Sequence, residues 1–173
     1  MLGLKRHTVH IVDYDPLWPT IASMTITELQ DALHGAIIDI QHIGSTAVPG
    51  LAAKPVIDLA ILVSTGTPIT SLMTLITPLG WLYVQGSLVE VGHLFVFESV
   101  SEIRTHHLHV VENHDNRWND YISFRDALRA DAALRDRYAQ IKQSLAAGHQ
   151  SDRQAYTDGK GDFVRATVAH GRG

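Results

Sequence analysis

Apolar residues along the first 112 positions follow two spacings, one typical of strands and one typical of helices. The longest apolar stretch, PVIDLAILV over residues 55–63, is apolar at almost every position, as in a strand buried on both faces. Six such stretches indicate strands, at residues 9–12, 36–40, 55–63, 81–84, 93–98 and 104–111. Short connections join the last three of them, so we expect these three strands to be antiparallel neighbours.

Helical spacing of apolar residues separates these strands in two places. The first helix is expected to begin with Asp15 as N-cap and Pro16 at its first position, and to end before Gly35. A second helix is expected to follow Thr67-Pro68 and to end at Gly80. Strands and helices therefore alternate through the N-terminal part of the chain.

The C-terminal third, from Asn116 onwards, has helical spacing throughout and predicts three helices. The third of these is expected to begin with Ser151-Asp152 as its cap. We predict an α+β fold in one domain over residues 1–173, with a sheet core over 1–112 and a helical part over 113–173.

Composition narrows the classes of function that are open to the chain. The content of 45% hydrophobic and 18% charged residues is typical of a globular protein, and the absence of cysteine excludes disulfides, thiolate zinc sites and a cysteine nucleophile. A net charge of −4 argues against broad binding to nucleic acid, but it leaves room for a basic pocket that binds one phosphorylated molecule. The N-terminus does not have the pattern of a signal peptide, and no apolar stretch is long enough to span a membrane. We therefore expect a soluble, cytoplasmic protein.

Asp58 is the one charged residue inside the apolar stretch 55–63. A buried carboxylate must be paired, protonated or bound to a metal. Earlier in the chain, Gly44-Ser45-Thr46 opens a loop of small residues whose N–H groups and hydroxyls are suited to an anion. This spacing predicts a phosphate at the loop and a divalent cation at Asp58. The alternatives are a plain strand-to-loop turn and a structural ion pair of Asp58 with Lys54 or Arg125.

The segment 42–58, HIGSTAVPGLAAKPVID, resembles the signature segment of the GrpB family. Other stretches that are similar to the family are Asp15-Pro16 with Trp18, HLHV over 107–110, FRDALR over 124–129, and Tyr156-Thr157 with Lys160. The resemblance implies a nucleotidyltransferase-like mixed sheet with helices packed on it and a helical C-terminal third. It also implies a site for a nucleotide-type ligand. Related proteins occur fused to a coenzyme A biosynthetic kinase in some bacteria, which points to nucleotide or coenzyme A metabolism.

The superfold implied by this resemblance has a second carboxylate two residues after Asp58, where this chain has Ala60. A two-metal site is therefore incomplete, and nucleotidyl transfer does not follow from the fold. His107 and His109 share one face of their strand, at a spacing used for zinc and similar metals, while His106 faces the other way. If the two strands are neighbours, Asp58, His107 and His109 form a site for magnesium, manganese or zinc. The alternative is a pair of half-buried histidines with ordinary hydrogen bonds.

Basic residues are the candidates for neutralising the charge of a bound phosphate. We assign Arg125 and Lys160, which lie in family-like segments, to phosphate binding together with Gly44, Ser45 and Thr46. We assign Lys54 a catalytic role beside Asp58. Arg129 and Lys142 could line the same side, but exposed ion pairing is the preferred interpretation for both.

Three functions remain open on this reasoning. The first is a metal-dependent transferase or hydrolase that acts at a phosphate of a nucleotide-type molecule. The second is a non-catalytic module that binds a nucleotide- or coenzyme A-related ligand in a degenerate site. The third is a metal-dependent hydrolase that uses histidine and aspartate and is unrelated to nucleotides. In the first two, the partner is a small phosphorylated molecule.

Overall fold

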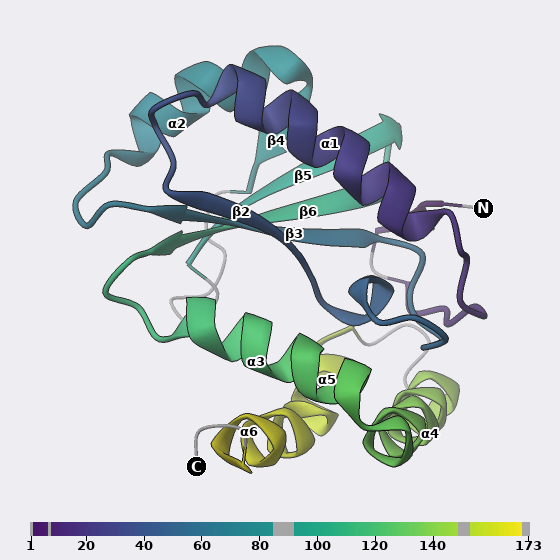
Figure 1. Cartoon of the computed structure of the whole chain (residues 1–173). Helices are drawn as coiled ribbons and strands as arrows, with labels where there is room; N and C mark the ends of the chain where they lie inside the picture. The colour runs from purple at the N-terminus through teal and green to yellow at the C-terminus, as the bar shows by residue number, and fades with distance from the viewer. Residues whose placement is uncertain (1, 7, 85–91, 149–152, 171–173) are drawn as a thin grey trace.

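A mixed β-sheet forms the centre of the protein (Figure 1). The computed structural model describes residues 2–6, 8–84, 92–148 and 153–170. Within them the sheet has the order β2-β3-β6-β5-β4, with β1 paired to β6. Its strands are β1 (Leu4–Lys5), β2 (Asp39–Ile43), β3 (Ile57–Val63), β4 (Trp81–Tyr83), β5 (His93–Val100) and β6 (Ile103–Glu112). The central pair β3–β6 is parallel and the other pairs are antiparallel, so the expected antiparallel arrangement of the last three strands is confirmed.

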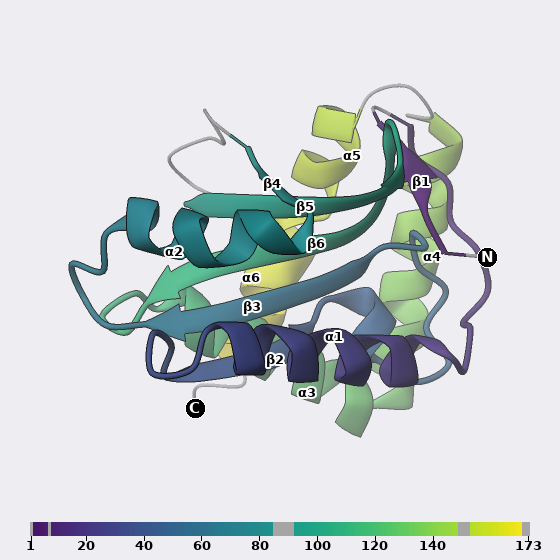
Figure 2. The same cartoon turned by 90° about the horizontal axis from the view of Figure 1, so that it is seen from above.

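Helices cover both faces of this sheet (Figures 1 and 2). One face carries α1 (Trp18–Ala32) and α2 (Ile69–Ile76). The C-terminal helices lie on the opposite side: α3 (Arg117–Ala130), α4 (Ala132–Gly148), α5 (Arg153–Gly159) and α6 (Gly161–His170). The predicted α+β fold, with a mixed sheet and a helical C-terminal third, is confirmed.

The apolar strand β3 is buried on both faces, as its sequence predicts. Ile57, Leu59 and Ile61 belong to the main core, which they share with Trp18 and Leu29 of α1. The alternate positions of β3 face the C-terminal helices. A second apolar cluster joins the loop after β2 to α3, α4 and α6, with Val48, Leu51, Phe124, Leu128, Tyr138 and Val168 as its buried members. The face of β3 towards α1 is therefore apolar, whereas Asp58 and Ala60 belong to its other face.

The N-terminal segment differs from the prediction. Residues 9–12 do not form a strand: Val12 makes a single bridge to Ala53, and the ladder strand lies earlier, at β1. Helix α1 begins at Trp18 rather than at Pro16. The Asp15 carboxylate accepts a hydrogen bond from the Leu17 N–H, so this aspartate closes a turn before the helix instead of capping it.

The last predicted helix is divided in two. A break at Lys160, between Gly159 and Gly161, separates α5 from α6 and gives four C-terminal helices in the described residues instead of three. Two glycines so close together weaken a helix because of their backbone freedom. The expected cap at Ser151-Asp152 lies outside the described residues. No helix in the described part of the chain is long and apolar enough to cross a membrane.

Candidate metal and phosphate site

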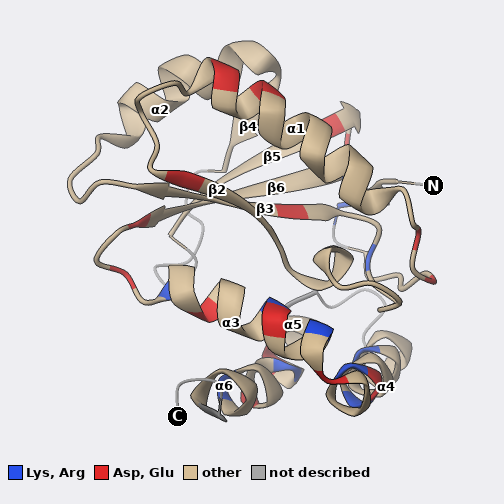
Figure 3. Ribbon diagram, in the orientation of Figure 1, with Lys and Arg blue, Asp and Glu red and all other residues tan. Residues whose placement is uncertain are grey.

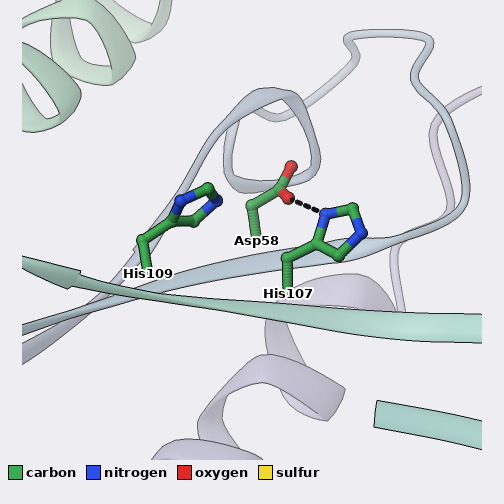
Figure 4. A group of neighbouring side chains, drawn as sticks. All are labelled: Asp58, His107 and His109. Atoms are coloured by element: carbon green, nitrogen blue, oxygen red, sulfur yellow. Dashed lines mark hydrogen bonds and ion pairs between the residues drawn. The ribbon is translucent and has the colours of Figure 1, made fainter. Parts of the chain in front are cut away.

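The parallel pairing of β3 with β6 brings the aspartate and both histidines of the sequence prediction together. Asp58 lies opposite His107 in the strand register, and Ala60 lies opposite His109. All three polar side chains project from the same face of the sheet (Figure 4). One potential ligand atom from each lies within 4.8 Å of the others. Asp58, His107 and His109, hereafter the metal-ligand cluster, form a group that could hold a metal ion.

His106 confirms the assignment of faces. Its Nε2 lies 3.3 Å from the hydroxyl of Thr25 on α1, and its ring packs edge-on against Trp81 and Phe97. It therefore faces the main core and cannot join the metal-ligand cluster. Burial lowers the pKa of His106 to about 4, so this histidine is neutral at pH 7.

Asp58 is an ionised carboxylate at neutral pH. Burial tends to raise its pKa, but the hydrogen bond from His107 and the charges of His107, His109 and Lys54 outweigh burial and hold the pKa below the usual range. The His107 Nδ1 lies 2.9 Å from Asp58 Oδ1, and 31% of the Asp58 side chain is exposed. The carboxylate is therefore charged and accessible, as a metal ligand must be.

Gly44 makes the close approach between the loop and Asp58 possible. It lies next to the end of β2, where Ile43 pairs with Asp58, and its φ is +70°. A Cβ atom at this position would lie 2.8 Å from Asp58 Oδ2. The residue is therefore glycine for two reasons, the left-handed backbone and the contact with the carboxylate. A plain strand-to-loop turn would not require this close approach to a carboxylate.

The hydroxyls of the loop already have protein partners. Thr46 is buried, and its Oγ1 lies 2.9 Å from His42 Nε2. Ser45 is half-buried and forms a hydrogen bond with Tyr138 of α4. Gly44 and Ser45 thus lie beside the metal-ligand cluster, whereas the Thr46 side chain points into the protein interior.

The arginines of α3 bind backbone rather than lining the cluster. Arg125 donates hydrogen bonds to the His42 carbonyl and to Gln41, each at 3.0 Å, and pairs with Asp126. Arg129 donates to the Ala47 carbonyl at 2.9 Å. Both arginines tie α3 to the segment around the glycine loop. A phosphate-binding role for Arg125 stays a prediction. To contact a phosphate, its guanidinium would have to break the hydrogen bonds to Gln41 and the His42 carbonyl or the ion pair with Asp126.

Two of the assigned lysines converge at one tyrosine. Lys54 Nζ lies 4.7 Å and Lys160 Nζ 4.9 Å from the ring centroid of Tyr156, which is buried. The Lys54 charge acts on Asp58, and Lys54 lines a small cavity together with His107, so this lysine lies near the metal-ligand cluster.

Lys142 corrects the sequence interpretation. Exposed ion pairing was the preferred interpretation, yet only 1% of this residue is exposed, and its ammonium donates to the Ala52 carbonyl at 2.5 Å. Burial and the nearby charges of Lys160 and Lys54 lower its pKa to about 7. The signal in the sequence was its position, four residues after Tyr138 on the apolar face of its helix.

The fold and the site together define an α+β protein whose mixed sheet presents one carboxylate and two imidazoles beside a glycine loop. The chain belongs to the GrpB family: the family model described as GrpB protein matches residues 8–170. The glutamate-rich protein GrpB of Alkalihalophilus pseudofirmus is 31% identical over 169 residues, which cover 95% of this chain and 96% of the relative. A crystal structure of the conserved protein GrpB from Enterococcus faecalis superposes with a TM-score of 0.82 at 25% identity, covering 94% of this chain and 96% of that one.

One further similarity is local. A dephospho-CoA kinase of Mycolicibacterium paratuberculosis is 40% identical over 63 residues. The match covers 35% of this chain and 16% of the kinase.

Proposed function

We propose that this chain binds a nucleotide-type phosphorylated ligand at one divalent metal held by Asp58, His107 and His109, and that it catalyses transfer or hydrolysis at a phosphate of that ligand. The observation that carries the proposal is the convergence of the three ligand atoms within 4.8 Å, beside the loop at Gly44. A carboxylate and two imidazoles are a common donor set for a transition metal.

The donor set favours a particular group of metals. Imidazole nitrogen suits zinc, manganese and ferrous iron better than magnesium, which prefers oxygen ligands. A divalent ion at this position would supply Lewis-acid polarisation of a phosphate oxygen. A metal ion bound by His107 Nδ1 would replace the hydrogen bond that this atom now shares with Asp58 Oδ1, 2.9 Å away.

The other residues of the site have simple roles in this proposal. Asp58 supplies the negative charge that retains the metal, and Gly44 leaves room for that carboxylate. Lys54 and Lys160 neutralise phosphate charge on the side of Tyr156. The local similarity to a dephospho-CoA kinase supports a ligand of nucleotide or coenzyme A type.

A non-catalytic binding module is the second candidate, and Ala60 favours it. A carboxylate here would complete a pair with Asp58 on the same strand face, but the Ala60 side chain offers no ligand and lies opposite His109. The cluster therefore accommodates one metal, not the two that clamp a phosphate from both sides. Such a module would bind the same ligand and leave it unchanged.

Metal binding is the first test. Elemental analysis of the purified protein, followed by calorimetric titration of the metal-free protein with zinc, manganese and magnesium, should reveal one site of transition-metal preference. His109→Asn should weaken this binding by at least about 100-fold, since one of three protein ligands is lost. His114→Asn removes an exposed histidine far from the cluster and serves as the matched control. Equal metal affinity in both variants would contradict the assignment.

Turnover separates the two candidates. The metal-loaded protein is incubated with nucleoside triphosphates and dephospho-coenzyme A, and the products are followed by phosphorus NMR. An enzyme should release a new phosphate species at a rate that Asp58→Asn lowers by at least about 100-fold. Thermal stabilisation by the ligand without any product would instead identify a binding module.

A further inference from the structure

A β-bulge turns Arg104 towards the face of the sheet that carries the metal-ligand cluster. In the register of β5 with β6, Phe97 pairs with His106. The next residue of β5, Glu98, pairs with Arg104, so β6 has one extra residue between the two pairs. The residues on either side of this extra residue lie on opposite faces of the sheet. Because His106 faces the main core, Arg104 lies on the face of His107, whereas regular alternation would have placed it with His106.

Arg104 and His107 line a small cavity beside the cluster. Its other lining residues come from the N-terminal segment and from the loop before β3: Leu4, Lys5, Arg6, Thr8, Lys54 and Val56. The cavity has a volume of about 20 Å³. A space of this size holds about one or two water-sized groups, so it admits the oxygens of a phosphate group but not a nucleoside.

The wall of this cavity is strongly basic. Of its described lining residues, four are Lys or Arg, one is histidine and none is acidic. Figure 3 shows that α1 and α2, on the other face of the sheet, carry no Lys or Arg, whereas α3 and α4 carry several. The cationic side of the sheet is thus the side of the cluster. A positive wall around a small cavity raises the local concentration of anions.

Glu98 positions the two arginines of the cavity. Its Oε1 accepts a hydrogen bond of 2.7 Å from Arg6 Nε and lies 3.6 Å from Arg104 Nε. A guanidinium has five N–H donors, so a contact at Nε is compatible with a second acceptor at the terminal nitrogens. Only 16% of the Arg104 side chain is exposed, and hydrogen bonds to an anion are stronger where solvent is largely excluded.

His107 belongs both to the metal-ligand cluster and to the wall of the cavity. Its Nδ1 lies 2.9 Å from Asp58 Oδ1, and Figure 4 shows Nε2 on the side of the ring away from Asp58. This second nitrogen is buried and has no hydrogen-bond partner within the part of the chain that the structure describes. A buried polar atom of this kind commonly marks the place of a bound water, ion or ligand group.

We propose that this cavity is a subsite for one phosphate group of the ligand, with Arg104 as its main contact. The inference rests on the proposed function, because the ligand at the metal reaches the cavity past His107. It deepens that function in one respect: phosphate is recognised from two sides, by the metal at Asp58 and by the guanidinium of Arg104. The small volume limits the occupant to an anionic group, so the rest of the ligand lies outside the cavity.

Phosphate binding without metal tests this subsite. In EDTA, orthophosphate is titrated into the protein, and the shifts of the backbone amide NMR signals over residues 103–107 give the affinity. Arg104→Met keeps an apolar stem and should weaken phosphate binding by at least about ten-fold. Arg165→Met removes an exposed arginine of α6, which pairs with Asp162, and should change nothing. Equal affinity in Arg104→Met and in wild type would overturn the proposal.

Glu98→Gln separates anion binding from a purely structural role of Arg104. The glutamine keeps an oxygen that accepts from Arg6 Nε, but it removes a negative charge next to both arginines. Phosphate affinity should therefore rise in Glu98→Gln, whereas it falls in Arg104→Met. An arginine that served only to pair with Glu98 would make both substitutions change the affinity in the same direction, and that result would contradict the proposal.

Arg104→Lys distinguishes a defined subsite from general attraction by positive charge. Lysine keeps the charge but lacks the planar fork that binds an oxyanion through two parallel hydrogen bonds. Phosphate affinity should fall at least about three-fold in this variant. Unchanged affinity would mean that charge alone attracts the phosphate, and the cavity would not be a defined site.

The proposed function and this inference can fail separately. Metal binding that depends on His109, together with phosphate binding that does not depend on Arg104, would overturn the cavity assignment and leave the metal centre standing. Phosphate binding in EDTA that is weakened in Arg104→Met, without any metal binding, would do the reverse.

Discussion

At the scale of single residues, Gly44 and Lys142 show how closely the chain is adapted to the cluster. Gly44 combines a φ of +70° with a position where a Cβ atom would approach Asp58 Oδ2 to 2.8 Å. Lys142 is a buried cation with a hydrogen bond to a backbone carbonyl. Apolar packing alone does not explain either residue. Gly44 is explained by its distance from the Asp58 carboxylate, and Lys142 by its hydrogen bond to the Ala52 carbonyl.

Substitution of Gly44 should therefore cost more than backbone strain. Gly44→Ala is expected to displace the Asp58 carboxylate and to weaken metal binding by at least about ten-fold, because the ligand loses its position. Gly35→Ala is the matched control: its φ is +76°, and nothing lies within 4 Å of the added Cβ. Gly35→Ala should lose about 1 kcal/mol of stability, and Gly44→Ala more, because Gly44 combines its positive φ with a ψ of −169°, a backbone region that is essentially restricted to glycine. Metal titration and chemical unfolding of both proteins measure the two effects separately.

At the scale of elements, helix α3 fixes the glycine loop to the sheet. Arg125 and Arg129 donate to the carbonyls of His42 and Ala47, on either side of Gly44. From α4, Lys142 likewise donates to the Ala52 carbonyl, and Tyr138 forms a hydrogen bond with the Ser45 side chain. The C-terminal helices thus hold the loop by polar contacts with its backbone and side chains, in addition to the second apolar cluster.

Loss of one of these contacts should loosen the loop. Arg125→Ala removes a buried guanidinium that satisfies a backbone carbonyl and the Gln41 amide, so we expect a stability loss of about 3 kcal/mol. Hydrogen exchange of the amides over residues 42–52 should accelerate. Arg165→Ala breaks an exposed pair with Asp162 on α6 and should change stability by less than about 0.5 kcal/mol. Equal effects of the two substitutions would contradict the proposed anchoring.

At the scale of the whole molecule, two neutral histidines lie on the face of the sheet towards α1, because His42 is opposite Leu59 and His106 is opposite Ile57 in the strand register. Burial lowers the pKa of His42 to about 4 and that of His106 to about 4, against an ordinary value of 6.5. Between pH 6.5 and pH 4 the unfolded chain therefore binds more protons than the folded one. Stability from these groups is complete above pH 6.5 and is lost as the pH falls towards 4.

Acid should consequently destabilise the protein well before its carboxylates titrate. We expect the free energy of unfolding to fall by about 3 kcal/mol between pH 7 and pH 5, with the two histidines contributing similar shares. His106→Phe keeps the ring contacts with Trp81 and Phe97 and should remove about half of this dependence. Urea unfolding at a series of pH values measures it, and the same slope in wild type and variant would exclude His106 as a source.

The sequence predicted the main features of the fold and the side-by-side position of Asp58, His107 and His109. The continuous apolar stretch of β3, with Asp58 inside it, predicted a buried strand with a functional carboxylate, because an uncompensated buried charge is costly. The spacing of His107 and His109 predicted a shared face, because strand side chains alternate. The predicted start of α1 was wrong. An aspartate before a proline can either cap a helix or close a turn, and the sequence alone does not distinguish the two roles of Asp15.

Local spacing by itself determined which side chains share a face: Asp58 with Ala60, and His107 with His109, but not His106. Only the tertiary structure decided which faces meet. The parallel pairing of β3 with β6 brings Asp58 opposite His107, and it joins residues 49 positions apart in the chain. The gathering of Lys54, Lys142 and Lys160 at two tyrosines likewise depends on how α4, α5 and α6 pack over the sheet. Periodicity acts over a few residues, whereas these contacts are set by packing between distant segments.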